Sequence, residues 1–181
     1  MATVQLKVSP EDLSQISHGG ERIPNPGIMV IFGASGDLTK RKLLPALFHL
    51  EQNGLLPKQF AIVGVARRPL GDEFAADMRE GIVDFGGADT NDPKLNDFVS
   101  NISYYALNFD DPAHYAGLKN ELDRIAKEKT ISGDRLFYLA TAPEYFADIV
   151  ENLGAQGMAQ PEQGQVGVVI EKPFGHDLDS A

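Results

Sequence analysis

The segment IMVIFGASGD, residues 28–37, decides the fold. Its first five residues, Ile28–Phe32, form an unbroken apolar run, which is typical of a strand buried on both faces of a parallel sheet. Glycines follow at positions 33 and 36, and an amphipathic segment begins at Leu38. A turn between a buried strand and a helix offers backbone amides and the positive helix end to a phosphate group. The segment therefore predicts a strand, a phosphate-binding turn and a helix.

The helix expected after this turn covers residues 38–52, LTKRKLLPALFHLEQ. The pattern predicts that Leu43, Leu47 and Leu50 share its apolar face. Pro45 predicts a kink, and Gly54 is placed to end the helix.

Strands and helices alternate along the rest of the chain. Further strands are expected at 60–66, 102–107, 135–141 and 165–171, and helices at 72–85, 93–102, 112–129 and 144–157. In the helix at 112–129, Asp111 is the expected N-cap, and the expected buried stripe is Tyr115, Leu118, Leu122 and Ile125. Such alternation predicts an α/β fold with a doubly wound, mostly parallel, Rossmann-like sheet. Residues 1–26 are expected to be a flexible extension, and residues 27–181 a dinucleotide-binding domain.

Composition narrows the function classes. The net charge is −10, so nucleic acid and membrane surfaces are disfavoured as partners. There is no cysteine, and the four histidines are far apart in the sequence, which disfavours a metal site. The first residues have no apolar run of a signal peptide, and the cytoplasm is the expected compartment.

The turn itself supplies the first candidate site. We expect the coenzyme to contact Gly33, Ala34, Ser35, Gly36, Asp37, Leu38, Thr39 and Lys40. The match to G-x-G-x-x-G is imperfect because Ser35 and Leu38 replace the second and third glycines, and a plain strand–helix connection is the alternative. Lys40 follows Thr39, an order that does not fit the phosphate loop of nucleoside triphosphatases.

Arg67 and Arg68 follow the second strand, where many dinucleotide-binding domains carry an acidic residue for the ribose. A guanidinium offers paired donors and positive charge to a 2′-phosphate, so the pair favours NADP over NAD. A solvated surface pair is the alternative.

Four longer stretches carry a resemblance to a known family: residues 31–50, IFGASGDLTKRKLLPALFHL; 61–68, AIVGVARR; 135–143, RLFYLATAP; and 169–178, VIEKPFGHDL. In order, spacing and wording they resemble the coenzyme domain of the glucose-6-phosphate dehydrogenase family. The resemblance implies that Gly33–Leu38 hold the pyrophosphate and that Arg67 holds the 2′-phosphate. It also implies that Lys172 touches both nicotinamide and sugar, with Lys42 nearby on the substrate side.

Two further positions are read from the same resemblance. Phe146 lies where family members often carry an aromatic residue near the coenzyme. Core packing explains it equally well, because Phe146 also fits the apolar side of its helix with Ile149 and Val150. Pro173 corresponds to a hinge proline, and a cis bond before it is a hypothesis.

The implied reaction is the oxidation of glucose 6-phosphate to a lactone by NADP, in the oxidative pentose phosphate pathway. The family's general-base histidine and its Arg-Ile-Asp-His-Tyr segment do not occur in these 181 residues, so no catalytic residue is assigned. We expect these residues to be inactive alone. For the apolar edge at Val166–Ile170 we expect either self-association or a cover from the N-terminal extension.

Two other functions are open. One is a regulator that senses NADP without catalysis. The other is a short-chain reductase that uses Tyr115 and Lys119, a pair that matches Tyr-x-x-x-Lys but lies on an early helix with Tyr115 facing the core.

Overall fold

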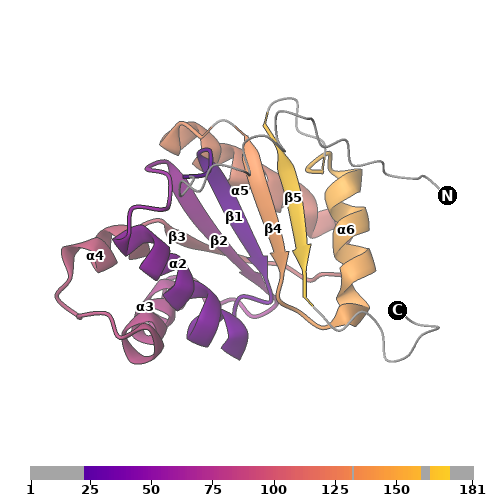
Figure 1. Cartoon of the computed structure of the whole chain (residues 1–181). Helices are drawn as coiled ribbons and strands as arrows, with labels where there is room; N and C mark the ends of the chain where they lie inside the picture. Colours follow the sequence, from indigo (N-terminus) through magenta and orange to yellow (C-terminus); the bar gives the residue numbers. More distant parts are fainter. Residues whose placement is uncertain (1–22, 132, 160–163, 172–181) are drawn as a thin grey trace.

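The computed structural model describes residues 23–131, 133–159 and 164–171, and within them the chain forms a five-stranded sheet in the order β3-β2-β1-β4-β5 (Figure 1). The strands are β1 Gly27–Phe32, β2 Phe60–Ala66, β3 Ile102–Ala106, β4 Asp134–Leu139 and β5 Val166–Ile170. Every neighbouring pair is parallel. The predicted α/β, Rossmann-like fold is therefore confirmed, although β4 ends before the expected Thr141.

Helices cover both faces of the sheet (Figure 1). The elements are η1 Thr39–Leu43, α2 Leu44–Gln52, α3 Glu73–Gly86, α4 Pro93–Val99, α5 Pro112–Lys129, η2 Pro143–Tyr145 and α6 Phe146–Ala155. The chain winds outward through α2, α3 and α4 from β1 to β3, and then returns to β4 on the far side of β1. The strand order thus reverses beside β1, the place where α/β sheets bind ligands.

Side chains of β1 enter two separate cores. Ile28, Val30 and Phe32 pack into the layer formed with α5 and α6, whereas Met29 and Ile31 pack into the layer formed with α2, α3 and α4. All five are at most 6% exposed. The apolar run at the start of the motif is therefore explained by burial on both faces.

The first helix differs from the expected one in its phase. Its start, η1, is wound as a π-helix, in which the Leu44 amide bonds to the Thr39 carbonyl. This wider winding directly precedes Pro45, which has no amide hydrogen to donate. Leu44 and Phe48 are buried, and the predicted Leu43 and Leu47 pack partly buried against the same core. Leu50, also expected on the apolar face, is 37% exposed. The prediction for Leu50 is wrong.

Gly54 ends this helix as predicted. Its φ is +70°, and the Leu55 amide bonds back to the Leu50 carbonyl at 2.9 Å. The Gly54 amide bonds to Glu51 at 3.0 Å, which completes a glycine-terminated helix end.

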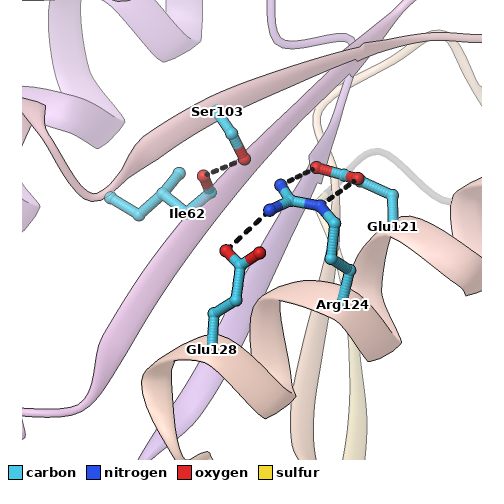
Figure 2. Close-up of polar contacts among 5 residues, drawn as sticks. All are labelled: Ile62, Ser103, Glu121, Arg124 and Glu128. Carbon is cyan, nitrogen blue, oxygen red and sulfur yellow. Dashed lines mark hydrogen bonds and ion pairs between the residues drawn. The ribbon is translucent and has the colours of Figure 1, made fainter.

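Helix α5 has both the N-cap and the buried stripe that the sequence pattern predicts. The Asp111 side chain accepts a hydrogen bond from the Ala113 amide at 3.0 Å, and the stripe from Tyr115 to Ile125 is buried. Figure 2 shows Arg124 bridging Glu121 and Glu128 along the helix, each at 2.6 Å. The hydrogen bond from Arg124 holds the pKa of Glu121 below its ordinary value.

Figure 2 also shows Ser103 of β3 donating to the carbonyl of Ile62 in β2.

Candidate functional site

The carboxyl ends of β1, β2 and β4 meet around the glycine turn. The register pairs Phe32 with both Val65 and Leu139, one on each side. The amides of Gly33 and Ala34 both bond to the Val65 carbonyl, at 2.8 and 3.1 Å. The turn is thereby fixed against the end of β2, two residues before Arg67.

Gly33 is required by the approach of β4. Its φ is +81°, and a Cβ atom added there would lie 2.4 Å from the carbonyl oxygen of Ala140. The Gly36 amide bonds to the Gly33 carbonyl at 2.9 Å and closes the turn. A side chain at position 33 would push β4 away from the turn, so the tightness of the turn depends on this glycine.

The residues after the turn begin a helix at the carboxyl edge of the sheet. The helical bonding begins with the Lys40 amide, which bonds to the Gly36 carbonyl at 3.3 Å. Amides of the first helical turn, here those of Asp37 and Leu38, have no acceptor within a helix. Gly36 and Asp37 are exposed. These amides, together with the positive end of the helix, suit a phosphate group.

Thr39 and Lys40 follow the turn at the start of this helix. Thr39 is fully buried, and Lys40 forms ion pairs with Asp77 at 2.6 Å and Glu80 at 2.7 Å on α3. Hydrogen bonds to these two carboxylates raise the pKa of Lys40. The contacts of Lys40 attach α3 to the turn, and the predicted contacts of Thr39 and Lys40 with a coenzyme stay predictions.

Arg67 and Arg68 are exposed beside the turn. The Nη1 atom of Arg67 donates to the Tyr145 hydroxyl at 3.1 Å, and its guanidinium carbon lies 5.3 Å from the centroid of the Tyr145 ring. The Tyr104 hydroxyl donates to the Arg68 carbonyl and, at 3.2 Å, to the Ala66 carbonyl. Two tyrosines thus hold the segment that carries the arginines. Sequence reasoning missed both, although Tyr104 is near the end of a predicted strand and Tyr145 follows another.

The remaining predicted residues divide into three cases. Phe146 is partly buried against the core formed with α5 and α6, which supports its packing role. Lys42 is exposed, and the described contacts include no hydrogen bond or ion pair for it. Lys172 and Pro173 lie outside the described residues, so their predicted roles stay predictions.

The edge also carries a link between its last two strands. The Tyr138 hydroxyl at the end of β4 donates to the carboxylate of Glu171 after β5. Burial, together with this carboxylate, raises the pKa of Tyr138 to about 12. The phenol therefore stays protonated at neutral pH and keeps its donor.

The reductase alternative does not fit the structure. Tyr115 is fully buried and donates to the Phe109 carbonyl at 2.8 Å, while Lys119 pairs with Asp123 at 2.6 Å. Burial raises the pKa of Tyr115. A phenol in this position cannot exchange a proton with a substrate at the sheet edge.

The opposite edge of the sheet carries a hollow of about 590 Å³, whose lining includes Gly27, Asp134 and Val166, at the starts of three strands.

Among the described residues no cluster of three or more histidine, aspartate or glutamate side chains could hold a metal ion. No helix in the described part of the chain combines the length and hydropathy needed to cross a membrane.

A parallel sheet that reverses its order beside β1, with a tight glycine turn and exposed helix amides at the reversal, defines a Rossmann-like domain of the dinucleotide-binding class. The sequence model described as "Glucose-6-phosphate dehydrogenase, NAD binding domain" matches residues 30–181. The chain belongs to the glucose-6-phosphate dehydrogenase family.

Relatives and solved structures agree with this assignment. The chain is 44% identical over 161 residues to the glucose-6-phosphate 1-dehydrogenase of Chlamydia pneumoniae, covering 86% of this chain and 31% of that protein. It is 42% identical to the enzyme of Bacillus subtilis strain 168, covering 85% and 30%. A glucose-6-phosphate dehydrogenase solved with glucose 6-phosphate superposes with a TM-score of 0.75 at 37% identity, covering 89% of this chain and 33% of that one. The chain thus spans about a third of the length of these relatives.

Because these relatives carry the name of an oxidoreductase, the comparisons do not favour the alternative of a regulator that only senses NADP.

Proposed function

We propose that the chain binds NADP at the carboxyl edge of its sheet and is the coenzyme-binding part of a glucose-6-phosphate dehydrogenase. The proposed reaction is the oxidation of glucose 6-phosphate to 6-phosphogluconolactone in the cytoplasm, within the oxidative pentose phosphate pathway. The names of the relatives support the reaction, and the relative solved in complex with glucose 6-phosphate supports the substrate. Residues 27–181 form the proposed coenzyme domain, after an extension at residues 1–26.

One observation carries the proposed site: the double hydrogen bond from Gly33 and Ala34 to the Val65 carbonyl. It joins the glycine turn to the end of β2. Arg67 and Arg68 come directly after that strand, so they follow the strand that the turn contacts. The amides of Asp37 and Leu38 suit the pyrophosphate. The guanidinium groups suit a 2′-phosphate, which an acidic residue in their place would repel.

NADP, when bound, accepts the hydride that leaves the sugar. The residues of this chain bind and orient the coenzyme. Lys172 is proposed to lie against both nicotinamide and sugar, and Lys42 to assist on the substrate side. Both proposals rest on the family's sequence pattern.

Calorimetric titration of the chain with NADP and with NAD tests the proposal. We expect tighter binding of NADP, and we expect Arg67→Gln to weaken NADP about 10- to 100-fold while NAD changes little, because charge-assisted hydrogen bonds to the 2′-phosphate are lost. Arg124→Gln is the control, since the Arg124 side chain is 51% exposed and its described ion pairs are with Glu121 and Glu128 of the same helix. Equal affinity for the two coenzymes in the unaltered chain would contradict the proposal.

We also propose that two copies of the chain associate through β5. Among the described residues, this strand pairs with β4 on one side and ends the sheet on the other. Val168 in β5 and Leu136 in β4 are 43% and 39% exposed. An apolar edge strand with unpaired backbone groups favours pairing with a second chain.

A further inference from the structure

Arg67 and Tyr145 come from two different loops at the carboxyl edge. Arg67 follows β2, and Tyr145 ends η2 immediately before α6. Their contact has two parts: a hydrogen bond of 3.1 Å from Nη1 to the hydroxyl and a cation–π contact of 5.3 Å with the ring. The ring therefore restricts both the position and the tilt of the guanidinium.

The Tyr145 ring is itself held in place. It packs edge-on against Phe109, with ring centroids 5.4 Å apart, and Phe109 is 3% exposed. Phe109 in turn packs edge-on against Phe32 of β1, at 5.9 Å. The Tyr145 amide bonds to the Ala142 carbonyl at 3.1 Å. Arg67 thus rests on a surface that is continuous with the core.

The contact leaves most of the guanidinium available. A guanidinium has five N–H donors in a planar fork, and the described contacts of Arg67 engage one nitrogen, Nη1. Arg67 is exposed, so its remaining donors reach solvent. One edge of the fork can then hold two oxygens of a phosphate while Tyr145 retains its hydrogen bond.

We propose that Tyr145 is a positioning residue that orients Arg67 before the coenzyme arrives and so increases the preference for a 2′-phosphate. The inference rests on the proposed function. Binding a flexible arginine costs rotamer entropy, and a side chain already held in place loses less. Because NAD has a hydroxyl where NADP has the 2′-phosphate, this gain belongs to NADP alone.

Titration calorimetry with NADP and NAD on Tyr145→Phe and Tyr145→Leu tests the proposal. Tyr145→Phe removes the hydroxyl and keeps the ring, and we expect NADP affinity to fall about 3-fold. Tyr145→Leu removes both contacts, and we expect a fall of about 10-fold. In both variants the affinity for NAD stays within about 2-fold, so the NADP-to-NAD ratio falls.

Tyr105→Phe is the matched control, because it removes a phenol hydroxyl that bonds to the His114 carbonyl and takes no part in the described contacts of Arg67. A merely structural role of Tyr145 would lower the affinities for both coenzymes equally and overturn the inference. An unchanged or increased NADP affinity would also overturn it. If the unaltered chain binds NADP no more tightly than NAD, the proposed function fails as well. If Arg67→Gln loses the preference for NADP and the Tyr145 variants keep it, only the role of Tyr145 is rejected.

Discussion

Gly33 lies where two strands and a turn leave no space for a side chain. A Cβ atom there would lie 2.4 Å from the Ala140 oxygen, and its φ of +81° already disfavours any other residue. We expect Gly33→Ala to lower the free energy of unfolding by about 2–4 kcal/mol, from backbone strain and overpacking together. Urea denaturation measures the loss.

Gly54→Ala separates these two causes. Gly54 has a φ of +70°, but no heavy atom lies within 4 Å of its added Cβ. We expect it to cost about 1 kcal/mol, from backbone strain alone. Equal losses in the two variants would show that the approach of β4 to the turn does not matter.

For single residues, the sequence predicted which residue types matter better than it predicted which groups their side chains contact. It singled out Gly33, Arg67 and the stripe on α5 from residue type and spacing. It predicted Lys40 as a coenzyme contact, but nothing in the local sequence shows that Asp77 and Glu80 come within 2.7 Å of its ammonium group. Tyr145 was missed for the same reason, since its contact with Arg67 spans 78 residues.

Helix α3 lies unusually close to the turn segment because Gly81 has no side chain. An added Cβ would lie 2.6 Å from both the Cγ and the carbonyl oxygen of Lys40. Replacing glycine by alanine within a helix ordinarily stabilises a protein. At position 81 we expect the free energy of unfolding to fall by about 1–3 kcal/mol instead, because the backbone of η1 must move. Gly154→Ala in α6 is the control, since nothing lies within 4 Å of its Cβ. It is expected to stabilise by up to about 1 kcal/mol in the same urea measurement. A stabilising Gly81→Ala would contradict the close contact.

Helix α5 is joined to β4 by an ion pair that depends on pH. Arg135 is 8% exposed in its side chain and donates to Asp123 at 2.5 Å. Burial alone would raise the pKa of Asp123, but hydrogen bonds from Lys119 and Arg135 hold it below its ordinary value of 3.8. The stabilisation is therefore complete above about pH 4 and is lost as the pH falls through the lower, folded-state pKa.

Asp123→Asn tests this link by thermal unfolding between pH 2 and 7. We expect a loss of about 1–2 kcal/mol at neutral pH, less than for a fully buried pair because the Asp123 side chain is 45% exposed. The difference from the unaltered chain shrinks below about pH 4. Asp84→Asn, at an exposed position of α3, is the control. A difference that does not change with pH would refute the role of the Asp123 charge.

Among the elements, those with strong local signals were predicted best. Helix α5 begins and ends where the Asp111 cap and the apolar stripe indicated. The first helix had the correct extent, and Leu43 and Leu47 pack against the core as predicted, but Leu50 does not. The π-winding before Pro45 cannot be read from a regular 3.6-residue period. Val150 was expected on the apolar side of α6, yet it is 42% exposed while Ile149 is buried. The apolar residues of α6 do not show from the sequence how far the helix is rotated about its own axis.

For the whole molecule, the alternation of strands and helices predicted the doubly wound, mostly parallel sheet, and the proposed association depends on the edge strand β5. We expect the chain to form dimers in sedimentation velocity runs as its concentration rises, and we expect Val168→Lys to shift it to monomer, because a charged residue blocks edge pairing. Val150→Lys is the control, since that valine is 42% exposed on α6. A chain that stays monomeric at every concentration, or two variants with equal effects, would contradict association through β5.

A phosphorylated dinucleotide is proposed to bind where the glycine turn meets the end of β2. The most direct measurement is a titration of the ¹⁵N-labelled chain with NADP, followed by the chemical shifts of its backbone amides. We predict that the largest changes occur at Ser35, Gly36, Asp37, Leu38 and Arg67. Changes centred instead on Gly27, Asp134 and Val166, at the opposite edge of the sheet, would contradict this binding site.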